Sequence, residues 1–245
     1  MKIELHRRDA YATMLVMIHF DPPPKFRGLD PNLPVRIYHR NLPHWRQDGA
    51  TYFVTFRLAD SLPQNKLEQL KEEKARWEKA YPPPRSQEQW KTYAQSVTAK
   101  TESWLDQGYG DCLLEKADAV RILGDALTYF HNERYDLFAS VIMPNHCHVI
   151  VKPLPGFELE EIEHSWKSFT AHEFGKQLDC IEGKIWQEES YDQIVRDCEN
   201  LWNLIRYIGN NPRKAKKHHG ESCALWINEE WKASGRDFPD PERES

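Results

Sequence analysis

Two histidines, His146 and His148, are separated by one residue in a stretch whose composition is typical of a β-strand. Because side chains alternate across a strand, both imidazoles face the same way, with Cα atoms about 6.5 Å apart. Two such nitrogens can bind one metal ion. The same alternation turns Cys147 to the opposite face, as a small core residue. A bare pair of this kind also fits ordinary hydrogen-bonded strand residues, so its meaning depends on what surrounds it.

Two tyrosines further along the chain, Tyr191 and Tyr207, are candidate nucleophiles. Tyr207 and Asn211 are four residues apart, a spacing that places two side chains on one face of a helix. A tyrosine has an ordinary pKa of about 10 and must lose its proton during attack, so it needs a nearby cation or base. The sequence does not identify this base. It also does not decide between Tyr191 and Tyr207 as the nucleophile.

Basic side chains gather in the stretch that contains and follows this tyrosine. They are Arg206, Arg213, Lys214, Lys216 and Lys217. The net charge of the whole chain is -5, so this local excess matters more than the sum. It can hold a phosphate backbone, and it is equally typical of solvated charges at a helix end.

The composition predicts one folded catalytic domain with attachments, because 245 residues with 40% hydrophobic and 12% aromatic content suffice for one sizeable core. Five cysteines without a C-x-x-C pair favour reduced thiols. No stretch approaches the ~20 apolar residues that span a bilayer. Several charged residues lie within the first 20 positions, where a signal peptide would have an apolar run. We therefore expect a cytoplasmic protein without a membrane partner.

Short strands and helices surround the candidate residues. The pattern predicts strands at 51–58, 135–142, 146–151 and 184–187, and helices at 65–80, 86–105, 117–132, 159–176 and 198–210. Asp197 is expected to cap the last helix and Pro212 to end it. This order favours an α+β fold, an antiparallel sheet with helices packed on one face.

Three parts of the chain are expected. Residues 1–46, rich in proline, read as an extended N-terminal arm; 47–217 as the catalytic domain, with a helical insertion at about 64–106; and 218–245 as a peripheral C-terminal tail. The sequence has no glycine-rich phosphate loop and no G-x-S-x-G motif, so nucleotide hydrolysis and α/β-hydrolase chemistry find no support.

Several segments, in the same order along the chain, resemble the REP-associated tyrosine transposases. These belong to the HUH single-tyrosine superfamily, which also contains insertion-sequence transposases and in which two histidines flank one hydrophobic residue. The matching segments are 52–56, 143–151, 166–170, 185–197 and 207–215. The resemblance covers most of 50–215, with Cys147 as a small apolar substitute between the histidines, and leaves out the arm, the insertion and the tail.

The resemblance implies a ferredoxin-like or RRM-like core and a transesterification on single-stranded or hairpin DNA. Tyr207 would attack a phosphate, form a 5′-phosphotyrosine and release a 3′-hydroxyl, with no nucleotide cofactor. Mg²⁺ or Mn²⁺ would be held by His146 and His148, with Asn211 as third ligand where insertion-sequence relatives commonly have glutamine, which reaches further. Tyr191 falls in a family-typical motif that is not catalytic. The family contains both monomers and homodimers.

Two other functions stay open. One is a domesticated relative that binds a DNA hairpin without turnover; the intact set of His146, His148 and Tyr207 favours the enzyme, because a pure binder has no need of metal ligands beside a nucleophile. The other is a structural zinc site in an interaction protein, which lacks a complete ligand quartet with zinc-type spacing.

Overall fold

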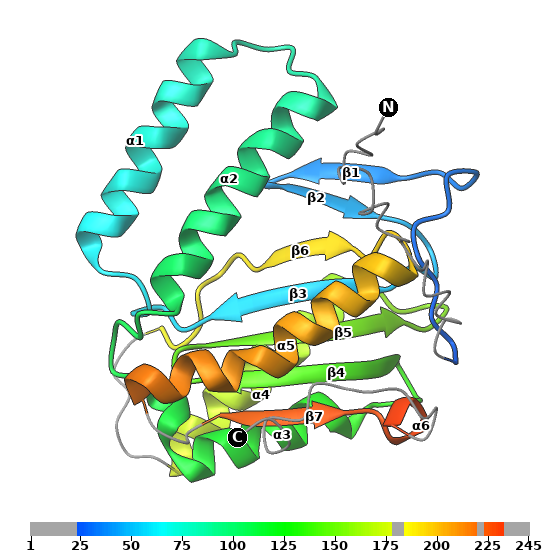
Figure 1. The fold of residues 1–245 in the computed structure, drawn as a ribbon, viewed down its shortest axis with the longest axis vertical. Coiled ribbons are helices and arrows are strands. Elements are labelled where there is room, and N and C mark those ends of the chain that lie inside the picture. The colour runs from blue at the N-terminus through cyan, green and yellow to red at the C-terminus, as the bar shows by residue number, and fades with distance from the viewer. Residues whose placement is uncertain (1–23, 178–183, 220–222, 233–245) are drawn as a thin grey trace, which may run out of the picture.

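The structure, a computed structural model, describes residues 24–177, 184–219 and 223–232, without the side chains of 213–219 and 231–232. A five-stranded antiparallel sheet, in the order β6-β3-β5-β4-β7, forms its centre (Figure 1). The strands are β3 (Tyr52–Arg57), β4 (Tyr135–Met143), β5 (His146–Pro153), β6 (Tyr191–Ile194) and β7 (Ala224–Ile227). The strands predicted around the histidines are present, whereas the short strand predicted at 184–187 is reduced to one bridge between Leu58 and Trp186.

Helices cover both faces of this sheet. α3 (Ala117–Tyr129) and α4 (Leu159–Gln177) pack on one face, and α5 (Cys198–His219) lies across the other (Figure 1). The α+β class is confirmed, but the expectation of helices on one face is wrong for α5. Helices cover both faces because each face of the sheet carries apolar side chains: in β4, Val141 and Ile142 point into opposite cores.

The start and the end of α5 are set by different residues. The Asp197 carboxylate accepts a hydrogen bond from the backbone N–H of Asn200 at 2.7 Å, which confirms the predicted N-cap. The helix then continues through Pro212 to His219, so the expectation that Pro212 ends it is wrong. A proline removes one backbone donor, and the helix accommodates that single loss while its earlier turns remain packed on the sheet.

The helical insertion projects from one edge of the sheet as a hairpin of α1 (Gln64–Ala80) and α2 (Gln87–Leu105) (Figure 1). Both helices agree with the prediction, and a capping box between Ser86 and Gln89 begins the second. The C-terminal end of α2 is tied down by a small apolar cluster that includes Trp104 and Leu105. The short 3₁₀ helix η1 (Leu113–Glu115) then leads into α3.

The segments expected as an arm and a tail contain regular structure. β1 (Arg36–His39) and β2 (Pro43–Arg46) form a two-stranded hairpin, so this part of the expected arm is a folded element and not a single unpaired segment. Its physical reason is a buried ion-pair network in which His44 and Arg46 both bind Asp192 of β6.

At the other end of the chain, β7 pairs with β4 as an edge strand and α6 (Glu229–Lys232) follows it. Residues 224–227 of the expected tail therefore belong to the central sheet. Among the described residues, no helix is long and apolar enough to cross a bilayer.

Candidate active site

The two histidines of β5 meet at their ring tips. His146 Nε2 lies 3.1 Å from His148 Nε2, and both side chains are buried on the face that α5 covers. Cys147 points into the opposite core, where burial raises the pKa of its thiol. The alternation expected from the sequence therefore places two imidazoles together and keeps the thiol away from them.

The protonation of His146 follows from its neighbour. The Asn145 amide nitrogen donates to the carbonyl of Tyr109 at 2.9 Å, so the Asn145 amide oxygen is the atom 2.8 Å from His146 Nδ1. An amide oxygen only accepts hydrogen bonds, so Nδ1 of His146 carries the hydrogen. In the neutral form of His146, Nε2 then presents its lone pair toward His148.

His148 is oriented in the same way from β3. The Thr55 hydroxyl donates to Glu102 Oε1 at 3.3 Å and lies 2.8 Å from His148 Nδ1. Because the hydroxyl has one hydrogen, it accepts the hydrogen bond that Nδ1 of His148 donates. When both rings are neutral, their Nε2 lone pairs face each other at 3.1 Å, an arrangement that a cation between them stabilises.

Tyr207 of α5 lies directly beside this pair. Its hydroxyl is 3.4 Å from His148 Nε2 and donates a short hydrogen bond to the Glu102 carboxylate. The ring is held by edge-on contacts with His148 and Phe53. Burial raises the pKa of Tyr207, and the negative charge of Glu102 raises it further.

Glu102 is the member of this side-chain cluster that the sequence did not reveal. It comes from the last turns of α2, and its Oε2 lies 3.5 Å from His148 Nε2. In the sequence it is one acidic residue among many in a charged helix, without a motif around it. The helical insertion therefore contributes a side chain to the site.

Asn211 lies one turn beyond Tyr207 on the same face of α5. Its side chain is fully buried, and within the described part of the chain neither its amide nitrogen nor its amide oxygen makes a well-aligned hydrogen bond. The Asn211 amide also interacts with the Tyr207 side chain, so it lies within reach of the groups around the histidines.

These residues fit a divalent metal ion. Glu102, His146 and His148 offer ligand atoms that all lie within 4.8 Å of one another. If two nitrogens each bind one metal ion at about 2.1 Å, with a right angle at the metal, they are about 3 Å apart. This is close to the 3.1 Å between the two Nε2 atoms. The buried oxygen of Asn211, one turn from Tyr207, is a further candidate ligand.

Tyr191, the competing tyrosine, lies on the outer strand. It pairs with Thr55 across β3 and β6, and its hydroxyl is 3.5 Å from Gln193. Burial raises the pKa of Tyr191 to about 12. The structure thus brings Tyr207, and not Tyr191, to the histidines.

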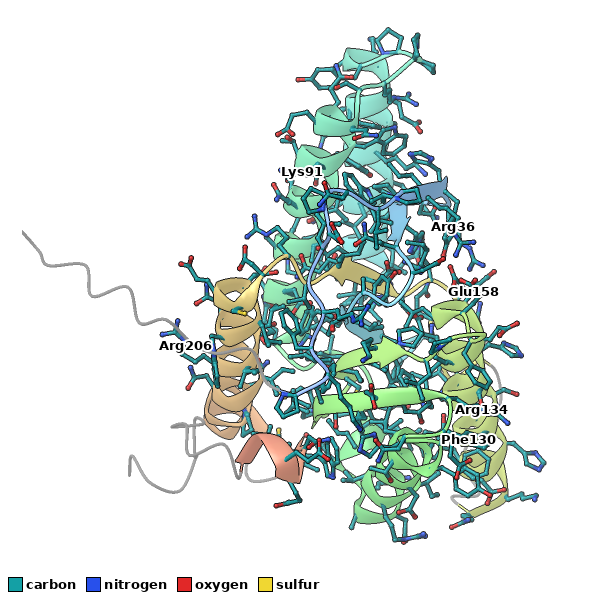
Figure 2. All side chains as sticks on the ribbon, turned by 90° about the vertical axis from the view of Figure 1, so that its right-hand side faces the viewer. Arg36, Lys91, Phe130, Arg134, Glu158 and Arg206 are labelled. Atoms are coloured by element: carbon teal, nitrogen blue, oxygen red, sulfur yellow. The ribbon has the colours of Figure 1, made fainter. Side chains whose placement is uncertain are left out.

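The basic stretch lies along α5 and beyond the site. Arg206 is exposed on the outer side of the helix and points away from the sheet (Figure 2). Arg213, Lys214, Lys216 and Lys217 continue the same helix, but their side chains lie outside the described residues. The structure therefore fixes the helix that carries this charge, and places only Arg206 by its side chain.

Comparisons with known proteins agree with the motifs found in the sequence. Residues 113–211 match the family model "Transposase IS200 like". This segment contains His146, His148, Tyr207 and Asn211, whereas Glu102 lies outside it. The match confirms the resemblance to insertion-sequence transposases.

A solved structure, that of a REP-associated tyrosine transposase bound to a REP hairpin, is 18% identical. The alignment covers 75% of this chain and 74% of that chain, with a TM-score of 0.40. No curated protein matches the chain.

Proposed function

We propose, from the match of residues 113–211 to the IS200-like transposase family model, that this protein cleaves and rejoins single-stranded DNA through Tyr207. One observation carries the proposal: the Tyr207 hydroxyl, the paired histidines and the Glu102 carboxylate converge, with His148 Nε2 3.4 Å from the hydroxyl and 3.5 Å from the carboxylate. A nucleophile, a proton acceptor and metal ligands are the three parts that a tyrosine transesterase needs.

The reaction is a transesterification in which atoms and charges balance. The phenolic oxygen of Tyr207 forms a bond to phosphorus, and the bond from phosphorus to the 3′-oxygen of the preceding nucleotide breaks. The products are a 5′-phosphotyrosine and a free 3′-hydroxyl, which takes up a proton. The reverse attack by a 3′-hydroxyl rejoins the strand and regenerates the tyrosine.

Glu102 receives the proton that Tyr207 gives up. The hydrogen bond from the hydroxyl to this carboxylate already lies along the path of the transfer, which supports this role for Glu102. Thr55 and Asn145 act as positioning residues, because each fixes the Nδ1 hydrogen of one histidine.

The proposed cofactor is Mg²⁺ or Mn²⁺, held by His146 and His148 together with Asn211 or Glu102. Such an ion polarises the scissile phosphate and offsets the charge that develops on its oxygens. The two oxygen-bearing candidates differ in origin, since Asn211 lies on the nucleophile's own helix and Glu102 on the insertion. Glu102 Oε2 both accepts the Tyr207 hydrogen bond and lies 3.5 Å from His148 Nε2, so Glu102 would serve as proton acceptor and metal ligand through the same carboxylate.

The substrate is a single strand or a hairpin, as the sequence resemblance implies, with the phosphate backbone along the basic stretch that begins at Arg206. REP-type repeats are the proposed targets. The chain would act as a monomer or a homodimer, and the active site described above needs no residue from a second copy.

The test is a search for a protein–DNA adduct that resists denaturation. Full-length protein is incubated with Mn²⁺ and labelled oligonucleotides that carry one hairpin and a randomised single-stranded flank. We expect a slow-migrating adduct that chelation of the metal prevents. His146→Ala should abolish it while retaining most of the hairpin binding. Adduct formation by His146→Ala, or by the wild type without metal, would overturn the metal-assisted reaction.

A further inference from the structure

A pocket of about 350 Å³ lies between the α1–α2 hairpin and the outer strands β3 and β6. Two residues of its lining, Thr55 and Glu102, also contact His148, and Glu102 contacts Tyr207. The pocket therefore borders the candidate active site, although the helical hairpin that forms its outer wall lies outside the segment that matches the family model.

Arg57 gives the pocket a positive charge next to the metal ligands. It lies opposite His146 in the pairing of β3 with β5 and lines the pocket. Its guanidinium donates to the Ser61 hydroxyl at 3.0 Å and to the Leu58 carbonyl at 3.4 Å, and it forms no ion pair with a carboxylate among the described residues.

Burial without a partner acid lowers the pKa of Arg57 to about 10. A largely buried cation of this kind is costly to keep, and an anion at the guanidinium would offset that cost. In a site that acts on a phosphodiester chain, a phosphate group has the matching charge and geometry.

The remaining walls suit a nucleobase. Tyr93 and Tyr191 contribute aromatic rings, and Leu70 contributes an apolar side chain from α1. Thr98 also lines the pocket, and its hydroxyl interacts with the Tyr191 side chain. Flat aromatic and aliphatic surface with a few polar groups is how proteins hold an unpaired base, and the volume lies in the range of small-ligand pockets.

We propose that this pocket binds one unpaired nucleotide that flanks the scissile phosphate, with its own phosphate against Arg57 and its base between α1, α2 and β6. The proposal rests on the proposed function, since Glu102 lines the pocket and also accepts the hydrogen bond of Tyr207, the proposed nucleophile. The helical insertion is then a substrate-binding element that contacts one base beside the nucleophile.

The test uses full-length Tyr207→Phe protein, so that no covalent step intervenes. Binding of the four deoxynucleoside 5′-monophosphates and of inorganic phosphate is measured by isothermal titration calorimetry. We expect at least one nucleotide to saturate with a Kd of about 1 mM or tighter, and inorganic phosphate to bind about 10-fold more weakly because it lacks the base.

Two further substitutions locate the binding. Leu70→Trp fills the pocket from α1, and we expect it to weaken nucleotide binding about 10-fold while phosphate binding stays unchanged. Arg57→Gln should weaken both ligands. Arg121→Gln, an exposed arginine on α3 across the sheet, is the matched control and should leave both unchanged. Thermal unfolding of each variant checks the fold, and Arg57→Lys, which keeps a charge, should retain part of the binding.

Nucleotide binding that is equal in the Leu70→Trp and parent proteins would overturn the proposal, as would the absence of saturable binding by any nucleotide. Phosphate binding as tight as nucleotide binding would also overturn it, since the base would then make no contact. These outcomes are separate from the adduct assay. An adduct without nucleotide binding refutes only the pocket, and nucleotide binding without an adduct refutes only the transesterification.

Discussion

The hydroxyl of Tyr207 lies 3.4 Å from Nε2 of His148, although 59 positions separate the two residues in the chain. The contact forms because α5 crosses the same face of the sheet to which β5 directs its histidines. It joins the two halves of the proposed site, the nucleophile and the metal ligands. The predictions below each test one part of this arrangement.

The carboxylate of Glu102 should set the rate of the covalent step. Glu102→Gln removes the proton acceptor and keeps the size of the side chain, so adduct formation should slow by about 10²-fold or more, with DNA binding little changed. Single-turnover rates of adduct formation measure this. Glu88→Gln, at the start of the same helix and exposed, should behave as wild type. An unchanged rate in Glu102→Gln would remove Glu102 from the mechanism.

The hydroxyl of Thr55 should control metal affinity without touching the ion. Thr55→Val leaves the Nδ1 hydrogen of His148 without its acceptor, so we expect Mn²⁺ affinity to fall about 10- to 100-fold. Thr55→Ser keeps the hydroxyl, so its affinity for Mn²⁺ should fall much less. Calorimetric titration with Mn²⁺ gives both constants, and equal affinity in Thr55→Val and wild type would contradict the proposed orientation.

The thiol of Cys147 should be irrelevant to the metal. Cys147→Ala should bind Mn²⁺ as wild type does, because the thiol points into the opposite core. The substitution should lower the free energy of unfolding by about 1 kcal/mol through the small cavity it leaves. Calorimetry and urea unfolding measure the two effects, and a loss of metal affinity in a folded variant would show that the histidine strand has a different register.

The buried His44 should make stability fall at alkaline pH. Burial alone would lower its pKa, but hydrogen bonds to Asp192 and Glu189 outweigh this and raise the pKa to about 9, despite the nearby Arg46. A raised pKa means that the ion pair stabilises fully below the ordinary value of 6.5 and is lost as the pH rises through about 9.

Urea unfolding between these two pH values should therefore show wild type losing on the order of 2 kcal/mol of stability that His44→Gln does not lose. His172→Gln, an exposed histidine of α4, is the control and should follow wild type. Parallel pH curves for wild type and His44→Gln would mean that the histidine is not charged in the folded protein.

Local patterns were enough to predict the parts of the site that lie on single elements. Strand alternation gave the common face of His146 and His148, and helical spacing put Asn211 one turn from Tyr207. Glu102 could not be predicted, because nothing local to α2 shows where a two-helix hairpin docks. Its place depends on the packing of Trp104 and Leu105 with Leu62 in a small apolar cluster at the base of the hairpin.

The fold shows the same division between local and long-range causes. The helices, and the strands on either side of the histidine turn, follow from periodicity and caps such as Asp197. The hairpin of β1 and β2 was missed because its strands are short and polar, and are held by Asp192, which lies about 150 residues away. The predicted end of α5 at Pro212 was wrong, because a proline ends a helix only when no packing compensates for the lost hydrogen bond.

The most direct test of the account is to identify the residue that carries DNA in the covalent adduct. The adduct is digested with nuclease and protease, and the peptide that retains a nucleotide is sequenced by mass spectrometry. We predict a 5′-phosphoryl linkage on Tyr207 and none on Tyr191, with no adduct in Tyr207→Phe. A linkage on Tyr191, or an adduct of unchanged yield in Tyr207→Phe, would contradict the assignment of the nucleophile.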